Sequence, residues 1–233
     1  MARCYKWLAG LWFTLLIVPA GCNNSKTADA DIADEQASDA ENASHSKDQA
    51  GSSTATRRRP KPAGDIFPVV VLHTSLGELT IKLNMAKAPQ TVNNFLHYVD
   101  VGHYNQTIFH EVEAGYVALG GSYTPELIEK QVRYPIPNEA DNGLRNLRGT
   151  IAMARSPDEI DSSTCQFFIN LNDNASLDHR GDSPEEFGYC VFGEVIKGME
   201  ILDKLAKVEV ESKGDFEKLP IQTVLIETVF RTK

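Results

Sequence analysis

The sequence predicts a mainly β domain, built as a closed antiparallel barrel with helices covering its open ends. From about residue 66 onward, short apolar or alternating segments follow one another closely, separated by turn residues. Only two segments have helical periodicity, and the strand-like segments lie too close in sequence for the crossovers that parallel pairing needs. Because closure removes exposed strand edges, a barrel is the natural arrangement for such strands.

The first half of this domain begins with two strands and a helix. An apolar run, FPVVVLHTS, precedes GELTIKLN, in which apolar and polar residues alternate as in a half-buried strand. The following helix has Pro89 in its first turn and ends at Gly102. Two further strands are expected at about 107–112 and 116–119.

The second half supplies three more strands, a second helix and a closing strand. The strands are expected at about 149–154, 166–171 and 189–195, and the helix GMEILDKLAK begins near Gly198. The segment PIQTVLIETVFRT closes the chain as a strand. Between the halves, residues 121–148 are rich in Gly, Pro and Asn and predict irregular structure, which is often functional at this length.

Residues 1–21 predict a signal peptide. An apolar run of about 14 residues follows two basic residues, which is too short for a comfortable membrane span. The sequence VPAGC at its end resembles a bacterial lipobox and makes Cys22 a candidate for lipidation, although Pro19 replaces the usual leucine. We therefore expect an exported, periplasmic or cell-surface lipoprotein anchored to a membrane. An ordinary signal peptide and a retained anchor are the alternatives.

Residues 22–65 predict a disordered acidic and polar linker, because they contain almost no large apolar side chains to bury. The folded domain is then expected over residues 66–233. The whole chain has a formal net charge of -9. This charge excludes a nucleic-acid binder that works by neutralising phosphates.

Cysteine and histidine patterns indicate no metal site. Cys165 and Cys190 lie in the domain, where they form either a disulfide or two buried free thiols, and we favour the thiols. No C-x-x-C motif is present, and His103 and His110 lack a third ligand. We therefore expect neither a metal nor an organic cofactor.

Four segments together carry a family resemblance: TVNNFLHYVDVGHYNQTIFH, NEADNGLRNLRGTIAMAR, CQFFINLNDNASLD and FGYCVFGEVIKGMEIL. In order and spacing these segments resemble those of cyclophilins, and their sequences are most similar to those of the bacterial branch. The resemblance covers nearly all of residues 68–230. It implies a closed eight-stranded antiparallel β-barrel capped by two α-helices, and peptidyl-prolyl cis–trans isomerisation without a cofactor.

The resemblance also implies a peptide site. Rotation about a peptide bond has a barrier of about 18–20 kcal/mol, so the site needs an apolar seat for the proline ring and a donor that favours the twisted amide. Gln166 matches a catalytic position. The matched substrate-binding residues are Phe109, Tyr116, Val117, Leu119, Met153, Ala154, Arg155, Phe168, Leu177 and Tyr189. Each of these taken alone is better explained as barrel core, and it is their joint match to the family that favours a pocket lining.

The polar centre departs from the family pattern. Glu111 stands where the family has the arginine that donates to the prolyl amide, and Leu119 replaces the glutamine that steadies this arginine. An ionised glutamate cannot donate, and losing one such donor typically costs about 10²–10³ in rate. Two alternatives remain: Glu111 is a solvated rim residue, or Arg155 pairs with it or partly replaces the donor.

Three functional hypotheses follow. The first is a prolyl isomerase that assists the folding of exported proteins, binds their proline-containing segments as a monomer and has weak activity. The second is an inactive proline-peptide-binding module that serves as a chaperone or scaffold. The third, a barrel that is only a spacer, fits the retained apolar seat least. Ser176 replaces a floor tryptophan of some cyclophilins, which predicts weak binding of the family's cyclic peptide inhibitor.

Overall fold

The computed structural model describes residues 66–232. The predicted signal peptide, the lipidation site at Cys22 and the linker therefore lie outside the described residues. The strands are β1 (Val69–Thr74), β2 (Gly77–Leu83), β3 (Thr107–Val112), β4 (Val117–Gly120), β5 (Thr150–Met153), β6 (Phe167–Asn170), β7 (Val191–Lys197), β8 (Val210–Lys213), β9 (Phe216–Pro220) and β10 (Val224–Arg231). The helices are α1 (Pro89–Asp100) and α2 (Met199–Leu205), with 3-10 turns at Ala140–Asn142 and Ala175–Leu177.

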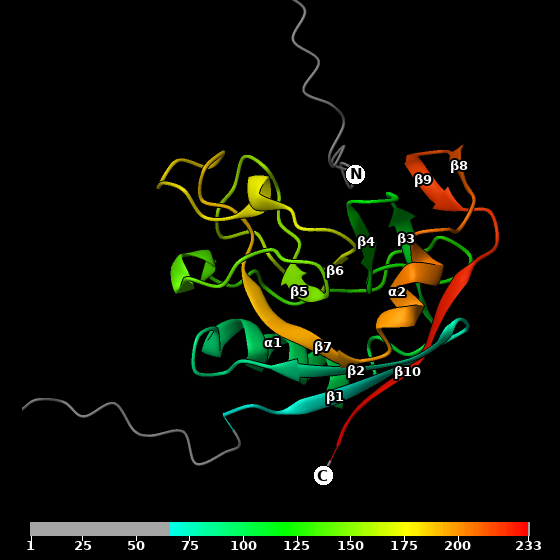
Figure 1. The fold of residues 1–233 in the computed structure, drawn as a ribbon, viewed down its shortest axis with the longest axis horizontal. Helices are drawn as coiled ribbons and strands as arrows, with labels where there is room; N and C mark the ends of the chain where they lie inside the picture. The colour runs from blue at the N-terminus through cyan, green and yellow to red at the C-terminus, as the bar shows by residue number, and fades with distance from the viewer. Residues whose placement is uncertain (1–65, 233) are drawn as a thin grey trace, which may run out of the picture. The chain divides into compact units, whose positions relative to one another are not determined.

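Eight strands close into an antiparallel barrel in the order β1-β10-β3-β4-β6-β5-β7-β2 (Figure 1). The first and last strands of the domain, β1 and β10, pair along their length, and β2 closes the circle against β7. The fold class predicted from the sequence is thus confirmed.

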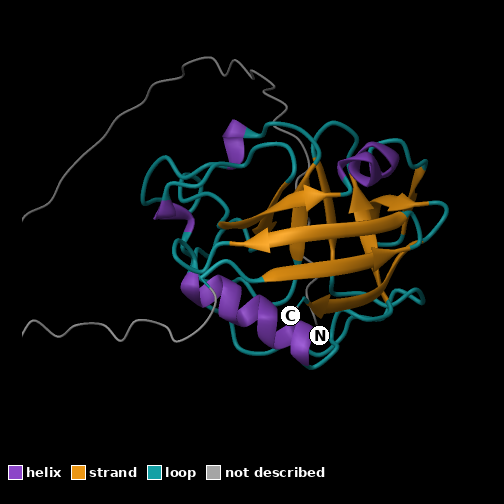
Figure 2. Ribbon diagram, turned by 60° about the horizontal axis from the view of Figure 1, so that its bottom comes forward, coloured by secondary structure: helices purple, strands orange, loops and turns teal. Residues whose placement is uncertain are grey.

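Both helices bury side chains in the barrel core, and Figure 2 shows them lying beside the strands of the barrel. Helix α1 buries Phe95 and Leu96, and the backbone N–H groups of Gln90 and Thr91 donate to the carboxylate of Glu139 at its start. This distant carboxylate satisfies two donors that the helix itself cannot, and its charge suits the positive helix terminus. Helix α2 buries Ile201 against the same core.

One element was not predicted. Strands β8 and β9 form a separate hairpin between α2 and β10. A Gly-Asp pair forms its turn, with Gly214 at φ 61°. Gly-Asp between two strand-like segments is a recognised hairpin signal, so the sequence did contain the clue. The predicted irregular stretch 121–148 is confirmed as loop, except for the 3-10 turn at Ala140–Asn142 and isolated bridges.

Cys165 and Cys190 are both free and buried, as favoured from the sequence. Within the described residues, no group of three or more His, Cys, Asp and Glu side chains could hold a metal ion. None of the helices in this part of the chain has the length and hydropathy of a membrane span.

Candidate functional site

A row of directly paired residues crosses five neighbouring strands of the barrel. Glu111 of β3 pairs with Leu119 of β4, which pairs with Phe168 of β6. Phe168 pairs in turn with Ala152 of β5, and Ala152 pairs with Val191 of β7. Directly opposed residues share one face of a sheet. The Glu111 carboxyl group therefore stands at one end of the row, and all the other members of the row are apolar.

The opposite face of these strands holds two residues that the sequence placed in the seat. Phe109 and Met153 belong to the main barrel core, and the Phe109 ring packs against Phe167 at 6.2 Å between centroids. A β-bulge between Phe109 and Glu111 breaks the alternation of β3 and turns these two side chains to different faces. Met153 pairs with Phe167 and shares its inward face.

The remaining apolar seat residues do come together. They form a second, smaller cluster, which we call the outer cluster: Val117, Leu119, Ala152, Ala154, Phe168, Leu177 and Val191, with Tyr116, Leu144 and Tyr189 packed against it. Sequence reasoning missed three members, Ala152, Leu144 and Val191. The period of two along a strand would have found Ala152 next to Ala154 and Val191 next to Tyr189.

Tyr189 links the outer cluster to Arg155. Its ring packs edge-on against Phe168 with centroids 5.7 Å apart, and the Arg155 guanidinium carbon lies 5.0 Å from the Tyr189 centroid. The guanidinium is buried and donates to backbone carbonyls of Ser156, Pro157, Pro184 and Gly188. Arg155 therefore does not form an ion pair with Glu111 in the described part of the chain, and its guanidinium already donates four hydrogen bonds to backbone carbonyls.

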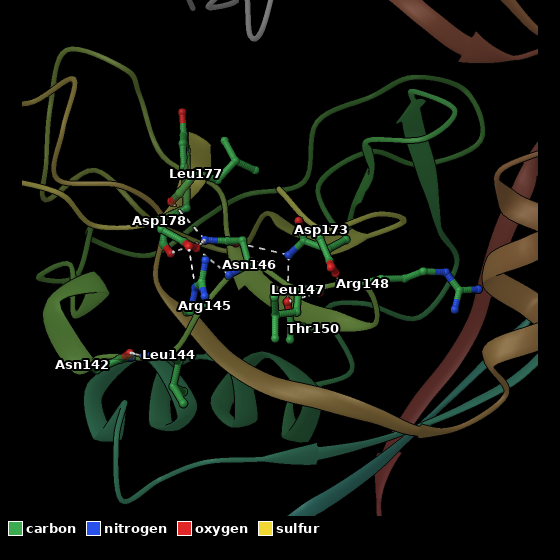
Figure 3. A network of polar contacts seen from close by, with 12 residues as sticks. Asn142, Leu144, Arg145, Asn146, Leu147, Arg148, Thr150, Asp173, Leu177 and Asp178 are labelled. Carbon is green, nitrogen blue, oxygen red and sulfur yellow. Dashed lines mark hydrogen bonds and ion pairs between the residues drawn. The ribbon is translucent and has the colours of Figure 1, made fainter. Parts of the chain in front are cut away.

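A polar network centred on Asn146 holds the backbone of Leu177 (Figure 3) and also contacts that of Tyr189. The buried side-chain amide of Asn146 donates to the carbonyl of Leu177 at 3.0 Å and to that of Tyr189 at 3.5 Å. The backbone N–H of Asn146 donates to Asp178 at 2.6 Å, and Asn170 donates to the Asn146 side-chain oxygen. These bonds tie the 3-10 turn that carries Leu177 to the strands.

Beside the outer cluster lies a cavity of about 400 Å³, which we call the side cavity. It shares Leu119 and Ala154 with the outer cluster. Its remaining lining residues are His110, Glu111, Tyr123, Glu129, Arg155, Ser156, Ser162, Thr164, Gln166, Ser212, Gly214, Asp215, Phe216 and Glu217. The unpredicted β8–β9 hairpin thus supplies one wall. Gln166 lines the cavity, and its side-chain amide makes no hydrogen bond within residues 66–232.

Glu111 is half-buried in this cavity, and no hydrogen bond or ion pair within the described residues holds its carboxyl group. Burial, followed by the nearby carboxylates of Glu113 and Glu217, raises the pKa of Glu111 to about 7, against the opposing charge of Lys218. At neutral pH both the protonated and the ionised forms of the group are therefore populated. In that form it carries one O–H donor, so the expectation that this position cannot donate applies only to its ionised form.

The comparisons with known proteins now agree with this geometry. The family model described as cyclophilin type peptidyl-prolyl cis-trans isomerase matches residues 69–229. The chain belongs to the cyclophilin family. It is 48% identical over 159 residues to peptidyl-prolyl cis-trans isomerase A of Dickeya dadantii, covering 68% of this chain and 82% of that protein. It is 46% identical over 161 residues to peptidyl-prolyl cis-trans isomerase B of Escherichia coli, covering 69% and 98%.

A solved cyclophilin has the same fold. The chain superposes on a cyclophilin-type isomerase of Cryptosporidium parvum, determined in the presence of the dipeptide Ala-Pro, with a TM-score of 0.61 and 25% identity. The match covers 71% of this chain and 99% of that one. Family, relatives and fold together make this chain an isomerase of the cyclophilin type. They confirm the family, the fold and the class of enzyme predicted from the sequence.

Proposed function

We propose that this cyclophilin isomerises Xaa-Pro bonds in exported proteins, as a monomer tethered to a membrane through Cys22, and that its turnover is weak. The carrying observation is the row of paired residues, in which an intact apolar surface ends in Glu111 instead of a permanent cation. The signal-like N-terminus and VPAGC support the exported location.

The site supports binding of a proline-containing segment. Tyr116 and Tyr189 are only partly buried and offer apolar surface at the edge of the outer cluster. The amide of Gln166 is available to hold the peptide backbone. The Ala-Pro dipeptide present with the Cryptosporidium parvum relative supports the same class of ligand.

Weak turnover follows from the polar centre. Arg155 is committed to backbone carbonyls and does not supply the missing donor. The neutral form of Glu111 offers a single O–H, whereas a guanidinium offers five N–H donors and a full charge. Preorganised charge is usually the largest catalytic contribution, so the site should stabilise the twisted amide poorly.

The same observations favour a second candidate, an inactive module that binds proline segments as a chaperone or scaffold. A protease-coupled turnover assay and a binding titration on the same Xaa-Pro peptide separate the two. Measurable turnover that disappears on Tyr189→Ala supports the isomerase. Binding without turnover supports the module, and the absence of both contradicts a peptide site at the outer cluster.

A further inference from the structure

We propose that the side cavity receives a lysine or arginine side chain of the bound peptide, so that this cyclophilin prefers Xaa-Pro segments with a basic residue close to the proline. The inference rests on the proposed function, because the basic side chain belongs to the peptide whose proline lies against the outer cluster. It names the substrate class of that site.

The charged groups of the cavity are mostly acidic. Four of its lining residues carry carboxyl groups: Glu111, Glu129, Asp215 and Glu217. None of them takes part in an ion pair within the described residues. The one lining cation, Arg155, has its guanidinium bonded to loop carbonyls. The cavity therefore has unpaired carboxyl groups on three sides: from β3, from the 121–148 loop that carries Glu129, and from the β8–β9 hairpin.

An independent feature of the cavity also points to a cationic guest. His110 lines the cavity, is 3% exposed, and its Nδ1 has no hydrogen-bond partner. Burial lowers its pKa to about 3, so the ring is neutral. A neutral imidazole nitrogen can accept a hydrogen bond from an ammonium or guanidinium group. A buried polar atom without a partner in a native fold calls for such an explanation.

Aromatic rings complete the site. Tyr123 and Phe216 line the cavity and pack edge-on against each other with centroids 5.0 Å apart, and both rings also contact His110. Aromatic faces attract Lys and Arg cations within about 6 Å. Carboxylates, a neutral imidazole and two rings around one cavity favour a cation over an anion or a purely apolar group.

The size and position of the cavity fit a side chain of the same peptide. A volume of about 400 Å³ exceeds that of a single long side chain. Leu119 and Ala154 line both the cavity and the outer cluster, so the two sites adjoin. In an extended peptide, side chains on one face are two residues and about 6.5 Å apart. The basic residue should therefore lie within two or three residues of the proline.

The preference should depend on pH through Glu111. The charged groups facing it are Glu113 at the end of its own strand, Glu217 and Lys218 from β9, and the neutral His110 beside it. A bound cation favours the ionised form of Glu111. Because the pKa of Glu111 is about 7 without a guest, the preference for a basic side chain should be small at pH 6 and larger at pH 8.

The test uses the full chain and paired peptides that differ in one side chain, lysine against norleucine, placed in turn at each of the three positions before the proline and the two after it. At one position and at pH 8 in low salt, lysine should raise kcat/KM or affinity about tenfold, which corresponds to about 1.4 kcal/mol. The ratio should fall at pH 6 and in 0.5 M salt, because exposed charges are screened.

Two double variants locate the effect. Asp215→Asn with Glu217→Gln removes two cavity carboxylates and should reduce the lysine preference to threefold or less. Glu209→Gln with Glu211→Gln removes two exposed carboxylates from the same segment, neither of which lines the cavity, and should leave the preference intact.

The outcomes separate this inference from the proposed function. If norleucine and lysine peptides are bound and turned over equally at every position, the inference is overturned and the proposed function stands. A lysine preference that is unchanged in the Asp215/Glu217 variant also overturns it. If neither peptide binds the wild-type chain, the proposed function fails and this inference fails with it.

Discussion

Replacing Glu111 with arginine restores the one charged donor that the row of paired residues lacks. Position 111 lies opposite Leu119, which lies opposite Phe168, so the new guanidinium would start at the end of the apolar row. Loss of one preorganised donor typically costs about 10²–10³ in rate, and its gain should be of the same order. The main competition comes from Glu113 and Glu217, the carboxylates that raise the pKa of Glu111.

This competition can be estimated. An exposed ion pair contributes about 0.2–1 kcal/mol, so pairing of the new guanidinium with Glu217 would reduce the gain by at most about fivefold. Glu111→Arg should therefore raise kcat/KM on an Xaa-Pro peptide by about tenfold or more. Adding Leu119→Gln should raise it again, because an amide directly opposite can fix the arginine rotamer. The two gains should be non-additive, as expected for neighbours in one hydrogen-bonded unit.

The assay is protease-coupled turnover of an Xaa-Pro peptide at pH 6 and at pH 8. The turnover of the wild-type chain should fall as pH rises through about 7, because the O–H of neutral Glu111 is lost, whereas the arginine variant should change little. Glu113→Arg is the matched control, since it makes the same charge change two residues away and should produce no comparable gain.

A further substitution tests the position of the proline seat. Phe168→Ala in the arginine background should abolish the gain. Since Phe168 is 1% exposed, this change also costs about 3–5 kcal/mol of stability, and circular dichroism must show that the variant is folded. If the wild-type chain already matches the arginine variant, another group supplies the donor. If the variant neither binds nor turns over peptide, the outer cluster is not the proline seat.

Four other predictions can be checked separately. Cys22→Ser should release the chain from membranes, and unchanged membrane partition would contradict the lipoprotein prediction. A fragment from Asp65 to Lys233 should fold and bind peptide alone, which circular dichroism and titration test. Glu139→Ala should lower the free energy of unfolding by about 1 kcal/mol and Tm by about 2–4 °C, because two N–H groups at the start of α1 lose their acceptor. An unchanged Tm would show that the Glu139 carboxylate does not stabilise the start of α1. Folding raises the pKa of Glu111 from 4.5 to about 7, so the stability that its proton contributes is fully present below about pH 4.5 and is lost as pH rises through about 7. Glu111→Gln should therefore stabilise the domain by about 1 kcal/mol at pH 8, allowing for solvent screening, and by little at pH 4, as denaturant titrations at both pH values can show.

Sequence periodicity was sufficient for the barrel, because each of its strands has its own apolar pattern and each helix its own start signal. It was not sufficient for the orientation of Phe109. The bulge between Phe109 and Glu111 depends on the register in which β3 pairs with β4. This register cannot be predicted from the sequence of β3 alone. The match to the family therefore placed Phe109 in the seat, whereas the pairing of β3 with β4 turns it to the other face of the strand.

Only part of the candidate site could be predicted, again because the rest depends on contacts between distant segments. The apolar members of the outer cluster have a recognisable pattern, whereas the wall of the side cavity comes from β8 and β9, about 100 residues after Glu111 in the sequence. Their segment is short, charged and mostly exposed, so hydrophobic patterning does not reveal it. The commitment of Arg155 to carbonyls of the 184–188 loop likewise depends on tertiary contacts that a sequence does not specify.

The substitutions at 111 and 119 have one combined physical effect. They are direct cross-strand neighbours, so replacing a polar amide with Leu119 removes a hydrogen-bonding partner from position 111 and covers part of it with apolar surface. Desolvation, the main cause of the raised pKa of Glu111, is increased by such a neighbour. The pair thereby replaces a permanent cation and its hydrogen-bonding partner with a titratable acid on an apolar wall. In a site with that chemistry, both the donor needed for turnover and the negative charge offered to the peptide depend on the same proton.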